Sequence, residues 1–246
     1  MNPLLVPIVA VQGMWMRSTI EMASPAAGPT SGTVGDPSRS PVRIAVVGES
    51  TAAGCGVDTH NDGFAGCLAR ELAQRIRRPV TWEVVGQHGA TARRIRYRFL
   101  PQLEENLDGQ RLDLAVLLAG GNDVLSRRTP DEWGADLAAI VDDLAARAGR
   151  VAVAGTPPFA AFPALPATLG RYLAERGSAL DAVSQQICAQ RPQAIWISST
   201  AGVPPPDSFA PDRFHPSAAG YRRWAQDVAP HIAHLVAQDG RRPRDA

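Results

Sequence analysis

The sequence has few cysteines and no surplus of charge of either sign. Only three of its 246 residues are cysteines, which is too few for a disulfide framework, and Cys55, Cys67 and Cys188 lack the spacing of a zinc site. Lysine and arginine total 25 against 24 aspartate and glutamate residues. Without a basic surplus there is no electrostatic basis for binding nucleic acid. We therefore predict neither a metal site nor a nucleic-acid partner.

The sequence also lacks a hydrophobic run long enough to cross a membrane. The apolar stretch from Pro3 to Met16 is shorter than the roughly 20 residues of a spanning helix, and Pro7, Gln12 and Gly13 interrupt it. It is not a typical signal peptide, because no Lys or Arg precedes it and no clear A-x-A cleavage site follows. We expect a cytoplasmic protein. The alternative is an exported protein, or one that touches a membrane peripherally through this stretch.

Large apolar residues are nearly absent from residues 23–41, which consist mainly of Ala, Gly, Pro, Ser and Thr. This composition has little to bury and is typical of a flexible linker. We predict an N-terminal apolar segment and flexible linker over residues 1–41, one domain over 42–238 and a disordered tail over 239–246. A domain of about 200 residues buries enough core to fold alone, and we expect a monomer.

After residue 41, apolar runs typical of β-strands alternate with helical patterns. The runs cover residues 43–47, 81–85, 112–118, 151–154 and 194–197. The third run is apolar on both faces, as in a central parallel strand that helices cover on each side. The alternation predicts an α/β fold, with an open five-stranded parallel sheet between helical layers. In such a fold, functional loops lie at the carboxyl ends of the strands.

Two helices carry specific signals for where they begin or stop. Thr129, Pro130 and Glu132 have the pattern of a capping box, which predicts a helix start at about Pro130. The last helix follows Pro216. Pro230 inside it predicts a kink or a break, because proline has no backbone N–H to donate.

Four polar segments fall at loops on the predicted carboxyl edge: GES, GQHGAT, GGND and DRFH. A reactive serine needs a base that accepts its proton, a group that orients the base, and donors for the developing oxyanion. The segments offer Ser50 as nucleophile, His215 as base and Asp212 as orienting group. The candidate oxyanion donors are the backbone amides of Ser50 and Gly89 and the side-chain amide of Asn122.

This ordered set resembles the SGNH hydrolases, the GDSL-type esterase and lipase family, over residues 42 to about 236. The matching residues stand in VVGESTAAG, VVGQHGAT, LAGGND and DRFHPSAAGY. The resemblance implies a three-layer α/β/α sandwich with a flavodoxin-like, five-stranded parallel sheet, and an esterase or lipase activity. In one departure, the first block reads Gly-Glu-Ser where the family usually has Gly-Asp-Ser.

Three functions stay open at this point. The leading hypothesis is a serine hydrolase of carboxylic ester, lipid or thioester substrates that acts through an acyl-enzyme on Ser50 and needs no cofactor. An acyltransferase would use the same residues. A flavodoxin-like protein would instead cradle a flavin or a phosphate at ESTAAG, but this leaves GGND and DRFHP unexplained.

Other residues near these segments have less specific interpretations. Phe159 and Phe162 follow the fourth strand and are candidates for the wall of an acyl pocket, although rigid loop packing explains them equally well. Cys55 is interpreted as core packing, and Asp123 is expected to bond neighbouring backbone. His88 either lines the site or lies on the surface.

Overall fold

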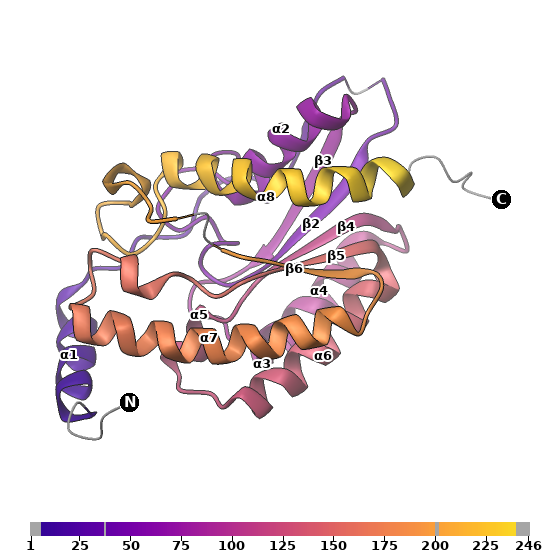
Figure 1. Cartoon of the computed structure of the whole chain (residues 1–246). Coiled ribbons are helices and arrows are strands. Elements are labelled where there is room, and N and C mark those ends of the chain that lie inside the picture. Colours follow the sequence, from indigo (N-terminus) through magenta and orange to yellow (C-terminus); the bar gives the residue numbers. More distant parts are fainter. Residues whose placement is uncertain (1–5, 37, 200–201, 240–246) are drawn as a thin grey trace.

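The computed structural model describes residues 6–36, 38–199 and 202–239, and its centre is a six-stranded sheet between two layers of helices (Figure 1). The strand order is β1-β3-β2-β4-β5-β6. The parallel strands are β2 (Val42–Gly48), β3 (Val80–Gly86), β4 (Leu112–Leu118), β5 (Ala148–Ala154) and β6 (Ala194–Ile197). The predicted α/β/α fold is confirmed, and each of the five predicted strands lies within three residues of its expected bounds.

The order of the parallel strands places a crevice beside β2. The chain passes from β2 outward to β3 and then returns to β4 on the other side of β2. In open α/β sheets, the loops that leave such a pair of strands in opposite directions bound the ligand site. The loop after β2 carries Ser50 and the loop after β4 carries Asn122, so the topology brings these two segments together.

The sheet has one strand more than the sequence predicted. β1 (Ser31–Val34) pairs antiparallel with β3, from Ser31 opposite Glu83 to Val34 opposite Val80. The flexible-linker prediction is therefore wrong for these four residues. Backbone N–H and C=O groups at the edge of β3 need partners whatever the side chains are, so a segment with little to bury can still join a sheet.

Helices cover both faces of the sheet (Figure 1). Alternate strand residues point to opposite faces. Ile44 and Val46 therefore pack in the core beneath α2 (Phe64–Ile76) and α8 (Ala218–Asp239), whereas Ala45 and Val47 belong to the core on the other face. The helices and short helical turns are α1 (Val6–Thr19), α2 (Phe64–Ile76), α3 (Ala92–Arg94), η2 (Ile95–Phe99), α4 (Leu100–Leu107), α5 (Gly121–Leu125), α6 (Pro130–Arg147), η3 (Phe159–Ala161), α7 (Ala167–Ala189), η4 (Pro206–Ser208) and α8 (Ala218–Asp239).

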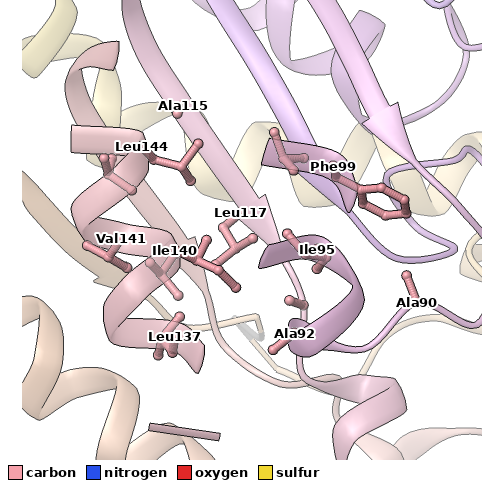
Figure 2. Close-up of a cluster of buried hydrophobic side chains, with 14 of the residues drawn as sticks. Ala90, Ala92, Ile95, Phe99, Ala115, Leu117, Leu137, Ile140, Val141 and Leu144 are labelled. Carbon is pink, nitrogen blue, oxygen red and sulfur yellow. The ribbon is translucent and has the colours of Figure 1, made fainter. Parts of the chain in front are cut away.

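The second core joins α6 and η2 to the sheet. Figure 2 shows Leu117 of β4 between Ile140 of α6 and Ile95 of η2, with Leu137 and Leu144 further along α6. These side chains are fully buried. Since burial of one such side chain contributes about 1.5–3 kcal/mol, this contact fixes the loops that follow β3 and β4 relative to each other.

Of the two predictions about where helices begin and stop, the structure confirms the first. The capping box is confirmed: the Thr129 side chain accepts from the backbone N–H of Glu132, and the Glu132 side chain accepts from that of Thr129. Of the predicted kink or break at Pro230, the break is wrong, because α8 continues through the proline to Asp239. Buried residues before and after the proline, including Val228 and Ile232, pack in the core with α2, and this packing holds the helix together.

The two ends of the chain are described to different extents. The apolar N-terminal segment forms α1, in which Val9 is buried and Ile8, Val11, Met14 and Trp15 are exposed. Within the described residues, no helix combines the length and hydropathy that a membrane span requires. Of the predicted tail, residues 240–246 lie outside the described residues.

Candidate active site

Ser50 lies two residues after the end of β2. The backbone N–H of Glu49 donates to the carbonyl oxygen of Leu118 at 2.9 Å, which ties the end of β2 to the end of β4. Gly48 permits this approach, since a Cβ there would collide with the same carbonyl. Ser50 is 9% exposed and lines a cavity. The predicted nucleophile is therefore held at the site and largely shielded from solvent.

His215 and Asp212 form a buried pair in the loop before α8. His215 Nδ1 lies 2.6 Å from Asp212 Oδ2, and the two side chains are 3% and 2% exposed. Asp212 Oδ1 accepts from the backbone N–H groups of Phe214 and His215, each at 2.9 Å. An ionised carboxylate can only accept, so Nδ1 carries the proton and the lone pair of His215 is on Nε2. This is the tautomer that a general base needs.

The hydrogen bonds to Asp212 decide its charge. Burial alone would raise the pKa of Asp212, but hydrogen bonds from the His215 ring and from the backbone of Phe214, Ala23 and His215 hold it well below its usual range. Asp212 is therefore an anion at neutral pH and can stabilise a protonated imidazole.

One partner of Asp212 comes from the segment that the sequence predicted as a linker. The backbone N–H of Ala23 donates to Asp212 Oδ2 at 2.9 Å, across 189 positions of the chain. A backbone donor leaves no mark in the side-chain pattern, and alanine is one of the commonest residues of the segment. No sequence signal could have identified it.

Asn122 stands in the first turn of α5. Its Nδ2 donates to Glu49 Oε2 at 2.8 Å, and its backbone N–H donates to the same oxygen at 2.9 Å. A side-chain amide has two N–H donors, so one remains for an oxyanion. Asn122 lines the same cavity as Ser50 and His215.

Gly89, the third predicted oxyanion donor, does not line the cavity. It adopts a left-handed backbone conformation with φ of 76° and is exposed, and it is not among the residues that line the cavity. Its neighbour His88 does line it, with a ring centroid 5.8 Å from that of His215. The conformation explains why glycine stands here. The structure does not bring Gly89 onto the cavity wall with the other candidates.

Glu49, the residue that departs from the usual family motif, is buried beside Asn122. Its Oε1 accepts from the backbone N–H of Gly121 at 3.1 Å. A Cβ on Gly121 would lie 2.6 Å from this oxygen, so glycine is needed for the contact. Burial and, to a smaller extent, the nearby Asp123 raise the pKa of Glu49 to about 7, against the hydrogen bonds from Asn122 and Gly121.

The cavity has a volume of about 370 Å³ and a largely apolar wall. Phe159 and Phe162 both line it, as the acyl-pocket hypothesis requires. Phe162 is central to an aromatic cluster, with ring centroids 5.5 Å from Phe159, 5.6 Å from Phe209 and 5.1 Å from Phe214. The sequence analysis missed Phe209 and Phe214. Phe214 stands inside the DRFH segment and Phe209 three residues before it, and that position was the available signal.

Two neighbouring residues have structural roles. Cys55 is fully buried, and burial raises the pKa of its thiol to about 12, so it is not a thiolate near neutral pH. Asp123 is also buried and accepts from the backbone N–H of Ala92 at 2.9 Å. Both observations agree with the structural interpretation of these residues.

The loop after Ser50 does not suit a flavin or phosphate. That hypothesis requires ESTAAG at the start of a helix, where free N–H groups bind anions. Residues 50–56 instead form turns, and α2 begins only at Phe64. No group of three His, Cys, Asp or Glu side chains within the described ranges could hold a metal ion.

Comparisons with known proteins give one family match and several similar solved structures. The model of the GDSL-like Lipase/Acylhydrolase family matches residues 46–223. Among solved structures, TesA is 25% identical, with a TM-score of 0.58 over 78% of this chain and 99% of TesA. A family 3 carbohydrate esterase from Clostridium thermocellum is 15% identical, with a TM-score of 0.64 over 81% of this chain and 98% of that one.

A variant of Axe2, an acetyl xylan esterase from Geobacillus stearothermophilus, is 17% identical, with a TM-score of 0.56 over 80% of this chain and 95% of that one. At these identities, the carbohydrate esterase and Axe2 are similar in fold alone. No curated protein matches the sequence.

Proposed function

The chain belongs to the GDSL-like lipase/acylhydrolase family and is a carboxylic ester hydrolase, and we propose that it acts through an acyl-enzyme on Ser50. The observation that carries the proposal is the cavity that Ser50, Asn122 and His215 share, with His215 hydrogen-bonded to the anionic Asp212 behind it. These are the nucleophile, oxyanion donor, base and orienting group that acyl transfer from an ester requires.

In the first half-reaction, Ser50 Oγ attacks the ester carbonyl carbon while His215 Nε2 accepts the hydroxyl proton. The negative charge that develops on the carbonyl oxygen is stabilised by the backbone N–H of Ser50 and the free N–H of Asn122. Collapse of the tetrahedral intermediate breaks the bond to the alcohol oxygen, and His215 returns the proton to that oxygen. The acyl group remains on Ser50.

In the second half-reaction, a water molecule attacks the acyl carbonyl carbon and His215 accepts one of its protons. The bond to Ser50 Oγ then breaks, the proton returns to this oxygen, and the carboxylic acid leaves. An alcohol in place of water would give acyl transfer by the same steps, so only product analysis separates a hydrolase from a transferase.

The wall of the cavity supports a preference for the acyl part of the substrate. Phe159, Phe162, Phe209 and Phe214 offer apolar contact to a hydrocarbon chain, and burial of each methylene contributes about 0.8 kcal/mol. An acetyl group would leave most of this surface without a partner. We therefore assign the enzyme to esters or thioesters with acyl chains longer than acetyl.

A fluorophosphonate probe and a chain-length series test the proposal. The probe should label Ser50, and Ser50→Ala should abolish both labelling and turnover of p-nitrophenyl esters. Thr51→Ala is the matched control, because Thr51 is the next hydroxyl on the same cavity. Labelling that persists in Ser50→Ala would contradict the nucleophile assignment. A kcat/KM highest for acetyl esters would contradict the substrate assignment.

A further inference from the structure

The segment ahead of the region that the family model matches runs along the active-site edge of the domain. That region begins at residue 46. Before it, the backbone N–H of Ala26 donates to the carbonyl of Ala53 at 3.0 Å, and the N–H of Ala27 donates to the carbonyl of Asp58 at 2.9 Å. Both acceptors lie in the loop that follows Ser50. Residues 23–34 are thus tied to the nucleophile loop at one end and to β3, through β1, at the other.

The contact of this segment with Asp212 differs from the other contacts of that carboxylate. Oδ1 accepts from Phe214 and His215, which belong to the same turn as Asp212. Oδ2 accepts from the ring of His215 and from the backbone N–H of Ala23, which comes from a distant part of the chain. The oxygen that orients the base is therefore held in place by Ala23.

Met22 adds a second contact between this segment and the site. Met22 is the residue directly before Ala23, and it lines the cavity that contains Ser50 and His215. One short stretch of backbone thus contributes both to the cavity wall and to the carboxylate behind the base.

We propose that this segment completes the active site and that Ala23 is a positioning residue, whose backbone N–H holds Asp212 in the orientation that His215 requires. The inference rests on the proposed function. Loss of the donor would leave Oδ2 with one partner, and the carboxylate would turn away from the imidazole part of the time. A hydrogen bond to a charged group has an effect of about tenfold or more on an equilibrium, so a similar loss of kcat follows.

The test removes one N–H group. Ala23→Pro replaces the N–H with a ring carbon, whereas Ala23→Gly keeps it. Ser24→Pro places a proline on the next residue, which is exposed. We expect a decrease in kcat of about tenfold or more for Ala23→Pro with little change in KM. Ala23→Gly and Ser24→Pro should remain within about threefold of the parent, and thermal unfolding should show that all three fold.

The second readout is the proton NMR resonance of the His215–Asp212 hydrogen bond, which reports the pair without substrate. It should shift or weaken in Ala23→Pro and stay unchanged in Ser24→Pro. An unchanged resonance together with an unchanged kcat in Ala23→Pro would overturn the inference. If the parent protein itself is not labelled at Ser50, the proposed function fails instead, and this resonance still measures the Ala23 contact.

A backbone ester covers the case in which Ala23→Pro does not fold. Replacing the amide between Met22 and Ala23 with an ester removes the same N–H and introduces no ring. The matched control places the ester before Ser24. Loss of kcat with the first ester and not with the second supports the inference, and equal kcat values for the two contradict it.

Discussion

Two buried carboxylates of the site, Asp212 and Glu49, have pKa values that are shifted in opposite directions. Asp212 accepts from three backbone N–H groups and from the ring of His215, and its pKa is held below the usual range. Glu49 accepts from two backbone N–H groups and from the amide of Asn122, yet its pKa is raised to about 7. The number of hydrogen bonds therefore does not by itself decide the charge.

The difference between the two pKa shifts follows from the depth of burial and from the neighbouring charges. Burial is the largest influence on both groups, and at Asp212 the hydrogen bonds together outweigh it. At Glu49 the donors are neutral amides and do not outweigh it, and the second carboxylate, Asp123, adds repulsion. Asp212 can therefore supply a fixed negative charge to the base, whereas Glu49 serves to position Asn122 and the first turn of α5.

The largest expected effect comes from removing the base that Asp212 orients. His215→Ala removes the proton acceptor that Asp212 orients, and kcat should fall by at least about 10⁴, close to the loss in Ser50→Ala. Steady-state kinetics on a p-nitrophenyl ester measures it. His88→Ala is the control, because His88 is the other imidazole on the cavity and has no carboxylate partner in the mechanism. An equal loss in the control would reassign the base.

Removing the donor that Glu49 holds should have the next largest effect. Asn122→Ala deletes an N–H that meets charge mainly in the transition state, so kcat should fall by about 10² to 10³ with little change in KM. Single-substrate kinetics separates the two constants. A change confined to KM would place Asn122 in ground-state binding.

A smaller effect should follow from changing Glu49 itself. Glu49→Gln keeps the length but turns an N–H₂ group toward N–H groups of Gly121 or Asn122, and a lost hydrogen bond of this kind costs about 1.5–3 kcal/mol. We expect kcat to fall about tenfold, because Asn122 is displaced rather than removed. Glu49→Asp keeps the acid and should retain more activity than Glu49→Gln. The reverse order would show that the acid is not what positions Asn122.

The smallest expected effect is on the pH dependence of stability, which should distinguish the two carboxylates. Burial raises the pKa of Glu49 from 4.5 to about 7 on folding. Between these values the folded protein keeps a proton that the unfolded chain releases, so Glu49 lowers stability as pH rises across this range, by up to about 3 kcal/mol. Urea unfolding at pH 5 and pH 7.5 should show the parent losing stability relative to Glu49→Gln as pH rises.

Asp212 should show the opposite sign in the same experiment. Its pKa is lowered on folding, so the stability that it contributes is present above pH 3.8 and is lost as pH falls below that value. The stability advantage of the parent over Asp212→Asn should therefore shrink in acid. A stability difference that is independent of pH in both variants would contradict the opposite ionisation of the two groups.

Much of the fold was predictable because its signals are local. Apolar side chains on both faces predict a buried strand such as residues 112–118. The capping box at Thr129 lies within four residues of the sequence. The ordered polar segments with Ser50, Asn122 and His215 were predictable as well, because each follows a strand or precedes a helix that is itself visible.

Features whose partners lie far away along the chain have no local signal in the sequence. β1 forms because the edge of β3 offers backbone partners, and α8 continues through Pro230 because its flanks are buried against α2. The residues proposed to carry the chemistry, and their order along the chain, could be read from the sequence alone. The folded chain determined that a backbone N–H at Ala23 holds Asp212 and that Glu49 is deep enough to titrate near neutral pH. Hydrogen bonds and desolvation of this kind depend on three-dimensional distance and burial, which the order of residues along the chain does not reveal.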